Sequence, residues 1–308
     1  MRVLVLGAGA TGGYFGARLI ESGADVSFLV RPQRAATLAR DGLVIHAASG
    51  GIRHEVQTLT AVAADRPFDL VLLSCKAYDL DSAIAAVAPA MHGETCLLPL
   101  LNGIRHLDVL DAAFGKSHVL GGLCHISVTV AEDGSIRQTG SIARLTFGQR
   151  EAAGGIPAIV RDGLLATPAE VICSTDVIAA MWQKFAFLAA LAGITCLMRA
   201  NIGAIVATPD GADLVRWLYL ECAEVARRSG HAPGERAISE AIDILTAPHS
   251  PLKASMLRDA ERGQRTEVEH VLGDMLARAN ALGVDAPLLG AACTQLRIHE
   301  ARLASGER

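Results

Sequence analysis

Apolar and polar residues follow two different patterns along this chain. The first half holds short apolar runs, beginning with residues 3–6 and 26–30, of the kind that buried parallel strands contain. Between those two runs, apolar residues recur at helical spacing from Tyr14 to Ile20, and Gly23 marks the end of the helix. The order strand, helix, strand predicts a βαβ unit at the beginning of the chain.

The rest of the first half continues the strand pattern. Asp133-Gly134 is a strong turn pair and predicts an antiparallel hairpin between residues 119–130 and 135–138. We expect further strands at 43–46, 55–59, 68–74, 96–101, 145–148 and 171–172, and helices at 32–40, 79–87 and 156–165.

After residue 174 the pattern changes to long helices, which we expect at 176–196, 210–229, 234–245 and, with a break near 283–287, across 265–303. This change predicts an α/β protein with a Rossmann-type N-terminal domain, residues 1–174, followed by an all-helical C-terminal domain, residues 175–308. Such a pair is typical of a cofactor domain with a lid or substrate domain. The cleft between the two domains is then the expected site.

Charge and composition exclude several classes of partner. The 308 residues carry a formal net charge of −4, with both signs mixed, which argues against nucleic acid or a membrane surface as a partner. The seven cysteines include no CxxC pair, so we interpret them as buried thiols in a reducing compartment. The chain begins without signal-peptide features, and its longest uncharged apolar run, 185–198, is shorter than the ~20 residues of a membrane span. We therefore expect a soluble cytoplasmic protein.

A complete GxGxxG motif stands between the first strand and the first helix. Its glycines permit a tight turn, a close approach of a pyrophosphate to the backbone, and close packing of helix on sheet. The helix N-terminus adds N–H groups and the positive end of a dipole. This context predicts a dinucleotide-binding loop rather than a glycine-rich turn of another α/β fold. The loop consists of Gly7, Ala8, Gly9, Ala10, Thr11 and Gly12.

The end of the second strand indicates which dinucleotide binds. An NAD site usually has Asp or Glu there, bonded to the ribose 2′-hydroxyl. Here Arg31 follows the strand, Arg34 is close behind, and there is no carboxylate. A guanidinium pairs with a 2′-phosphate, so NADP is favoured over NAD as the cofactor. The alternative for Arg31 is a solvated charge at a strand end.

Two more polar residues follow predicted strands. Lys76 comes after the strand at 68–74, and Asn102 comes after the strand at 96–101. Ligands of open α/β sheets gather at the carboxyl ends of the strands. We therefore consider Lys76 for contact with the cofactor and Asn102 for contact with nicotinamide or substrate. A surface lysine and an Asn-Gly turn explain these positions equally well.

The helical half has two charged residues of interest. Lys184 is the one charged residue between Asp176 and Arg199. A lysine in so apolar a helix costs free energy unless it is paired or faces a cleft, and burial moves the pKa of a lysine toward the range of proton transfer. The alternative is a lysine whose stem packs while its ammonium reaches water. Glu267, taken alone, is explained as a carboxylate in a helix that we expect to open at Thr266.

Several segments together carry a more specific signal: GAGATG at 7–12, Arg31, Cys75-Lys76-Ala77, Leu101-Asn102-Gly103, Trp182-Gln183-Lys184, SMLRD at 255–259 and RTEVE at 265–269. With these segments the chain resembles, essentially end to end, the ketopantoate reductase family of NADP-dependent 2-dehydropantoate 2-reductases. The resemblance implies that Lys184 is the general acid and that Asn102 holds this lysine and the nicotinamide end. It implies that Glu267 and Ser255 hold the substrate, and that Arg31 and Lys76 face the adenosine phosphate.

The same resemblance implies a helical domain of the 6-phosphogluconate dehydrogenase C-terminal-like kind and a place in pantothenate and coenzyme A biosynthesis. The chain departs from the family at two positions. The family usually carries asparagines one and two helical turns after the lysine, where this chain has Leu188 and Ala192. These positions share a helix face with Lys184. An apolar wall there would remove hydrogen bonds to a polar substrate.

The resulting hypothesis is NADPH-dependent reduction of a 2-oxo acid, with 2-dehydropantoate as the first candidate and Lys184, Asn102 and Glu267 as the catalytic residues. One alternative is a more apolar 2-oxo acid or ketone. The other is a non-catalytic NADP-binding regulator. The sequence has no cluster of ligands at metal spacing, so we expect no metal. Helical second domains of this kind often pair, so a homodimer is a candidate assembly.

Overall fold

The chain divides into two compact units. Met1–Leu101 and His106–Val177 form the first, and Asn102–Arg105 and Ile178–Arg308 form the second. This division differs from a single boundary after residue 174, because the loop 102–105 leaves the first unit and packs with the second. The computed structural model describes residues 1–47, 50–63, 67–151 and 155–306.

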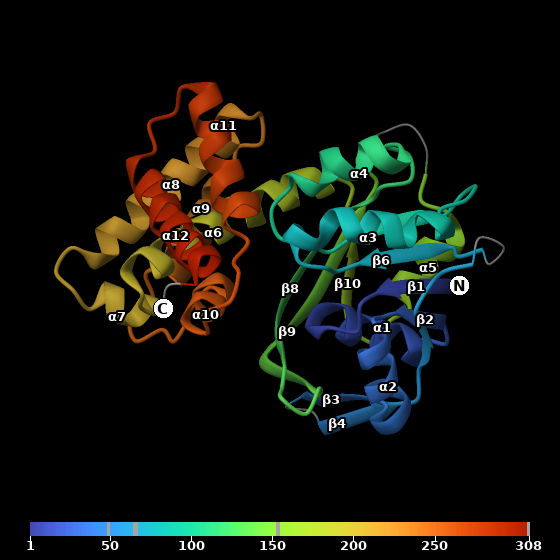
Figure 1. Cartoon of the computed structure of the whole chain (residues 1–308). Helices are drawn as coiled ribbons and strands as arrows, with labels where there is room; N and C mark the ends of the chain where they lie inside the picture. The colour runs from blue at the N-terminus through green and yellow to red at the C-terminus, as the bar shows by residue number, and fades with distance from the viewer. Residues whose placement is uncertain (48–49, 64–66, 152–154, 307–308) are drawn as a thin grey trace. The chain divides into compact units, whose positions relative to one another are not determined.

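A five-stranded parallel sheet forms the centre of the first unit (Figure 1). Its order is β5-β2-β1-β6-β7, and the register aligns Leu6, at the end of β1, with Leu29 of β2 and Leu73 of β6. β1, β6 and β7 are almost completely buried, as their apolar sequences predict. The strands are β1 (Arg2–Leu6), β2 (Asp25–Leu29), β5 (Gln57–Leu59), β6 (Leu70–Leu73) and β7 (Cys96–Pro99).

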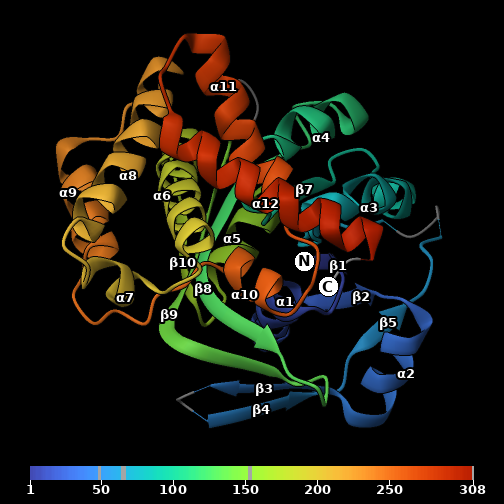
Figure 2. The same cartoon turned by 60° about the vertical axis from the view of Figure 1, so that its left-hand side comes forward.

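A second sheet of mixed direction completes the first unit (Figure 2). The predicted hairpin is confirmed: β8 and β9 pair antiparallel around a turn in which Gly134 has a φ of +81°. The strand expected at 145–148 is the end of the long β9, and the one expected at 55–59 is replaced by β4 and β5. The strands are β3 (Leu43–Ala47), β4 (Gly50–His54), β8 (Gly121–Val130), β9 (Ile136–Gly148) and β10 (Glu170–Cys173).

Helix α1 packs between the two sheets. A Cβ added at Gly16 would lie 2.5 Å from the ring of Phe28 in the parallel sheet, and one added at Gly13 would lie 2.4 Å from Ile136 in the second sheet. The small residues of α1 therefore let it approach both sheets closely. The sequence did not predict α4. The helices of this unit are α1 (Ala10–Glu21), α2 (Pro32–Asp41), η1 (Ala77–Asp79), α3 (Leu80–Val87), η2 (Ala88–Ala90), α4 (His106–Phe114) and α5 (Ala158–Leu165).

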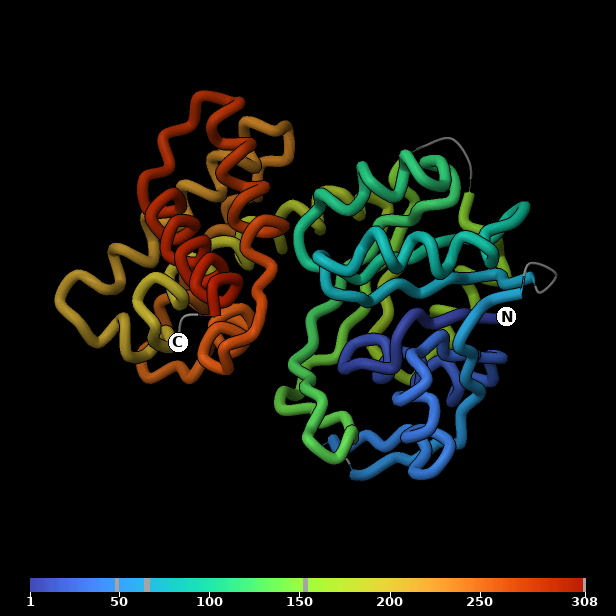
Figure 3. The backbone as a smooth tube through the Cα atoms, in the orientation of Figure 1, coloured from blue at the N-terminus to red at the C-terminus, as the bar shows by residue number. Residues whose placement is uncertain are grey.

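The second unit is helical, and its chain path can be followed from yellow to red in Figure 3. The predicted fold class, a Rossmann-type sheet followed by a helical domain, is confirmed. Two short helices, α7 and α10, were not predicted, and Thr266 and Glu267 precede a helix that begins at Val268. The elements are α6 (Val177–Met198), α7 (Ile202–Val206), α8 (Gly211–Arg228), α9 (Glu235–Leu245), α10 (Ser255–Glu261), the π-helical turn η3 (Glu269–Gly273), α11 (Asp274–Leu282) and α12 (Pro287–Ser305).

Helix α6 supplies much of the core of the second unit. Phe185, Ala186, Ala189 and Ile194 are at most 1% exposed. By length and composition alone this helix would be able to cross a membrane, but 61% of its most apolar 18-residue window is buried inside the protein. Such burial is typical of a core helix.

Candidate active site

The glycine motif forms the turn that leads from β1 into α1. Gly7 has a φ of +85°, which a side chain would strain, and its N–H donates to the Leu29 carbonyl of β2 at 2.9 Å. A Cβ at Gly12 would lie 2.6 Å from the Gly7 carbonyl oxygen, so only glycine allows this packing. A Cβ at Gly9, in contrast, would meet nothing within 4 Å. The turn therefore leaves open backbone beside the N-terminus of α1, which fits the pyrophosphate of a dinucleotide.

Arg34 lies on α2, the helix that follows β2, and its side chain contacts the glycine turn. Its Nη2 atom donates a hydrogen bond of 3.0 Å to the Ala8 carbonyl, and its Nη1 lies close to Gly134 of the β8–β9 hairpin. Burial lowers the pKa of this guanidinium. Arg34 is thus engaged with the protein backbone, and we infer that it fixes the shape of the glycine turn.

Arg31 and Lys76 lie at the same edge of the parallel sheet as the glycine turn. Arg31 comes two residues after β2, Lys76 comes three residues after β6, and both strands flank β1 in the sheet. The Arg31 side chain is exposed at the start of α2, and Lys76 is half-buried at the start of η1. The parallel register therefore brings together the predicted cofactor residues of this unit.

Lys184 and Asn102 meet in the second unit, although 82 positions separate them. The Lys184 Nζ atom donates to Asn102 Oδ1 at 3.4 Å in a partly buried contact. The lysine comes from the middle of α6 and the asparagine from the loop 102–105. An amide oxygen at this distance stabilises the charged ammonium and restricts its position.

The residues on both sides of Glu267, Thr266 and Glu269, are bound to α12. On one side, the N–H and hydroxyl of Thr266 both donate to Glu300 Oε1, at 2.6 and 2.7 Å. On the other side, Arg297 donates to both carboxylate oxygens of Glu269, at 2.7 and 2.8 Å. Between these anchors the Glu267 residue is only 7% exposed. The backbone segment that carries Glu267 is therefore anchored on both sides.

His270 is a site residue that the sequence analysis missed. It occupies the π-helical turn, its ring is hydrogen-bonded to the backbone of Asn102, and the charges of Glu267 and Asp274 act on it. A Cβ at Gly103, where φ is +76°, would lie 3.1 Å from the His270 carbonyl oxygen. Burial lowers the pKa of His270, and the two carboxylates only partly offset this effect. The π-helical turn is a signal of functional sites, but it cannot be read from the sequence.

The remaining predicted residues have mixed outcomes. Ser255 is exposed at the beginning of α10, and within the described ranges no hydrogen bond joins it to Lys184, Asn102 or Glu267. Leu188 is half-buried and Ala192 is buried, one and two turns after Lys184 on α6. This stretch of the helix is therefore apolar in the structure, as the sequence indicates.

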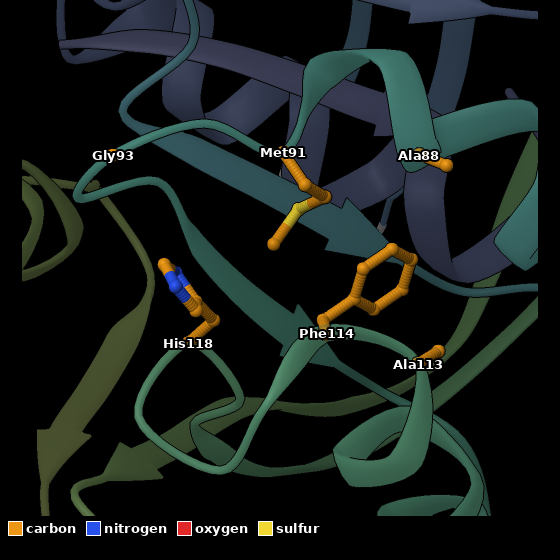
Figure 4. Close-up of a pocket in the computed structure, with 6 residues that line it drawn as sticks. All are labelled: Ala88, Met91, Gly93, Ala113, Phe114 and His118. Carbon is orange, nitrogen blue, oxygen red and sulfur yellow. The ribbon is translucent and has the colours of Figure 1, made fainter.

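A cavity of about 330 Å³ lies elsewhere in the first unit. Figure 4 shows Met91, Phe114 and His118 around it, and Ala88, Gly93 and Ala113 complete its lining. Met91 precedes β7 and Phe114 ends α4, so the cavity lies at the amino ends of the parallel strands, at the edge opposite the glycine turn. It is therefore separate from the predicted cofactor residues. Over the described part of the chain, no group of three or more His, Cys, Asp or Glu side chains is arranged to hold a metal ion.

Two family models match the chain. Ketopantoate reductase PanE/ApbA matches residues 3–152, and Ketopantoate reductase PanE/ApbA C terminal matches residues 176–300. The chain belongs to the ketopantoate reductase family. It is therefore a member of a family of oxidoreductases, and the resemblance stated from the sequence motifs is confirmed.

Individual relatives span the whole chain. An uncharacterized oxidoreductase, YkpB of Bacillus subtilis, is 39% identical over 98% of this chain and 99% of its own length. The crystal structure of a PanE/ApbA family ketopantoate reductase from Ralstonia eutropha superposes with a TM-score of 0.88 at 26% identity, covering 99% of this chain and 100% of that one. A D-mandelate dehydrogenase with NADH and anilino(oxo)acetate has a TM-score of 0.89 at 19% identity and 99% coverage of both chains, which shows a shared fold.

Proposed function

We propose that this protein is an NADPH-dependent reductase of 2-oxo acids, with 2-dehydropantoate, which it would reduce to pantoate, as the first candidate substrate. The observation that supports this most directly is the contact between Lys184 and Asn102, because it supplies a positioned ammonium donor in an otherwise apolar helix. Membership of the ketopantoate reductase family supports the reaction class.

In this proposal the first unit binds the cofactor. Backbone N–H groups of the turn from Gly7 to Gly12 hold the pyrophosphate, while Arg31 and Lys76 bind the phosphate of the adenosine part. When bound, NADPH supplies the hydride for the carbonyl carbon. A D-mandelate dehydrogenase that shares this fold has been solved with NADH, which supports a nicotinamide cofactor. The preference for NADPH here rests on Arg31 and on the absence of a carboxylate after β2.

The second unit supplies the proton and holds the 2-oxo acid. As negative charge develops on the ketone oxygen, the Lys184 ammonium stabilises it and transfers a proton to it, which completes the alcohol. Asn102 positions the ammonium, and Glu267 and Ser255 orient the substrate. Because the residues beside Glu267 are bound to α12, the backbone that carries this carboxylate would not need to rearrange on binding.

A second candidate is a family member that reduces a more apolar 2-oxo acid or ketone. The observation that favours it is the apolar character of α6 at Leu188 and Ala192, beside the proposed acid. Apolar side chains there would bind an alkyl or aryl group better than the hydroxyl group of ketopantoate.

A substrate panel separates these readings. The purified protein is assayed with NADPH against ketopantoate and against 2-oxo acids with larger alkyl or aryl groups, with wild type and Leu188→Asn side by side. If ketopantoate has the highest kcat/KM in wild type, the first candidate holds. If a more apolar acid does, and Leu188→Asn shifts the preference toward ketopantoate, the second holds. NADPH binding with no turnover of any acid would contradict both and support a non-catalytic regulator.

A further inference from the structure

Arg105 is the last residue of the loop 102–105, which belongs to the second unit. It comes three residues after Asn102, so the two Cα atoms are no more than about 11 Å apart. Its side chain is exposed, whereas the preceding Ile104 is buried and anchors the loop. The guanidinium is therefore carried by the same loop that places Asn102 beside Lys184.

The local structure does not account for an arginine at this position. Arg105 directly precedes α4, where Ser, Thr, Asp or Asn usually caps a helix and where a positive charge opposes the helix dipole. Among the residues that the structure describes, its side chain takes part in no hydrogen bond or ion pair. A guanidinium keeps its proton at any working pH. The loop that positions the proposed acid thus also carries a permanent positive charge.

Two carboxylates of η3 and α11 are already paired with other arginines. Arg297 binds both carboxylate oxygens of Glu269, and Arg278 lies 3.0 Å from Asp274. Arg105 is therefore not needed to balance either carboxylate, and its charge remains for another anion.

The charge of Arg105 acts on the candidate site. Burial lowers the pKa of His270, an effect that the charge of Glu267 opposes and that of Arg105 increases. The loop also packs directly on this histidine, because its ring is hydrogen-bonded to the backbone of Asn102 and a Cβ at Gly103 would lie 3.1 Å from its carbonyl oxygen. The guanidinium thus lies near residues to which the reaction is assigned.

Given the proposed reduction of a 2-oxo acid, the substrate brings a carboxylate that needs a cation. Lys184 gives its proton to the ketone oxygen, so it is neutral when the hydroxy acid has formed, and Glu267 repels a second carboxylate. An arginine stays charged throughout, and its planar fork matches a carboxylate with two parallel hydrogen bonds. It is therefore suited to hold the carboxylate of both substrate and product.

We propose that Arg105 binds the carboxylate of the substrate and makes the enzyme selective for 2-oxo acids over uncharged ketones. This selectivity also narrows the second candidate function. The apolar stretch of α6 at Leu188 and Ala192 then favours an alkyl or aryl group on a 2-oxo acid, and a simple ketone lacks the group that Arg105 recognises.

Kinetics with the best acid of the substrate panel and with its methyl ester test the proposal. The ester has the same ketone and carbon chain but no charge. Arg105→Gln should lower kcat/KM for the acid roughly 10–100-fold, as expected for loss of hydrogen bonds between charged groups, and should change that for the ester less than about twofold. Arg105→Lys keeps the charge without the fork, so it should recover part of the loss.

Arg236→Gln is the matched control. It removes the same charge from an exposed ion pair on α9 and should change neither value. Equal losses for acid and ester in Arg105→Gln, or no loss for either, would overturn the proposal and leave the reduction of 2-oxo acids in place. A wild type that reduces no 2-oxo acid would contradict the proposed function itself, and the role of Arg105 with it.

Titration with oxamate, an unreactive isostere of a 2-oxo acid, separates binding from turnover. In the presence of NADPH, the Kd for oxamate should rise roughly 10–100-fold in Arg105→Gln. The Kd for NADPH should stay the same, which also verifies that the variant is folded. Equal affinity of wild type and Arg105→Gln for oxamate would contradict the role assigned to the guanidinium.

Discussion

Lys184 and Asn102 lie within hydrogen-bond distance in the second unit, with 3.4 Å between Nζ and Oδ1. One residue comes from the apolar core helix α6, and the other comes from a loop that is continuous in sequence with the first unit. The loop residues 102–105 thus belong to the helical unit although β7 precedes them. The ammonium position depends on how this loop is held, which leads to the first prediction.

Gly103→Ala should reduce activity by displacing Asn102. A side chain at this position would adopt a φ of +76° and would also press on the His270 backbone at 3.1 Å. We expect kcat to fall roughly tenfold and the free energy of unfolding to fall by about 1–2 kcal/mol. Steady-state kinetics and chemical denaturation measure the two effects.

The control is Gly283→Ala in the same unit. Gly283 has a φ of +64°, but a Cβ there would meet nothing within 4 Å. This variant should lose a similar amount of stability and keep its kcat. Equal activity of the two variants would show that the loop does not position the lysine.

Glu300→Ala should weaken substrate binding through Thr266. Without the carboxylate, the buried N–H and hydroxyl of Thr266 lose their acceptor, and one anchor of Glu267 is removed. An unsatisfied buried donor costs about 1–3 kcal/mol, so we expect the KM for the 2-oxo acid to rise roughly tenfold or more. The KM for NADPH should not change, and Glu240→Ala, at an exposed ion pair on α9, should change neither. An unaltered substrate KM in Glu300→Ala would exclude this role.

His270 should make the stability of the protein depend on pH. Because burial lowers its pKa in the folded state, the unfolded chain takes up this proton at a higher pH than the folded chain does. The contribution to stability is therefore present above the ordinary pKa of 6.5 and is lost as the pH falls through the folded-state pKa. Denaturation curves measured between neutral and acidic pH should show a shallower loss of stability in His270→Gln. The exposed His92→Gln variant tests whether that difference is specific to His270.

Arg31 and Arg34 should have different effects on cofactor use. Arg31→Ala removes one of the two proposed partners of the 2′-phosphate, Lys76 being the other, so the KM for NADPH should rise roughly tenfold and that for NADH should stay constant. Arg34→Ala releases the Ala8 carbonyl and loosens the glycine turn, so binding of both cofactors should weaken. Fluorescence titration with NADPH and NADH distinguishes the two. Identical profiles for the two variants would contradict this division of roles.

The elements with a strong local signal were the ones that the sequence predicted. The βαβ unit, the hairpin at Asp133-Gly134 and the long helices of the second half all carry their own periodicity and boundary residues. Helix α4 was missed because its short apolar face looks like loop sequence after an Asn-Gly pair. That the loop 102–105 groups with the second unit could not be predicted either, because this depends on its packing with His270, and no local pattern shows that contact.

For the candidate site, too, local sequence patterns identified residues but not the tertiary contacts between them. Motif positions identified Lys184, Asn102 and Glu267, and the structure brings the first two into contact. His270 and the anchors Glu300 and Arg297 act through contacts with residues 28 to 34 positions away or with the distant loop 102–105. Spacing along one chain cannot predict such tertiary contacts, and the π-helical turn that presents His270 has no sequence signature.

The central claim is that the Lys184 ammonium is the proton donor, and the rate of a single turnover tests it most directly. NADPH oxidation is followed with excess enzyme and the best acid of the substrate panel, comparing wild type with Lys184→Met and with Lys116→Met, a surface control. We predict a decrease of roughly 10²–10⁴-fold for Lys184→Met and none for the control. General acid catalysis usually contributes at least about 10²-fold to a rate. If the Lys184→Met substitution lowers the single-turnover rate by less than about twofold, the result would contradict the account.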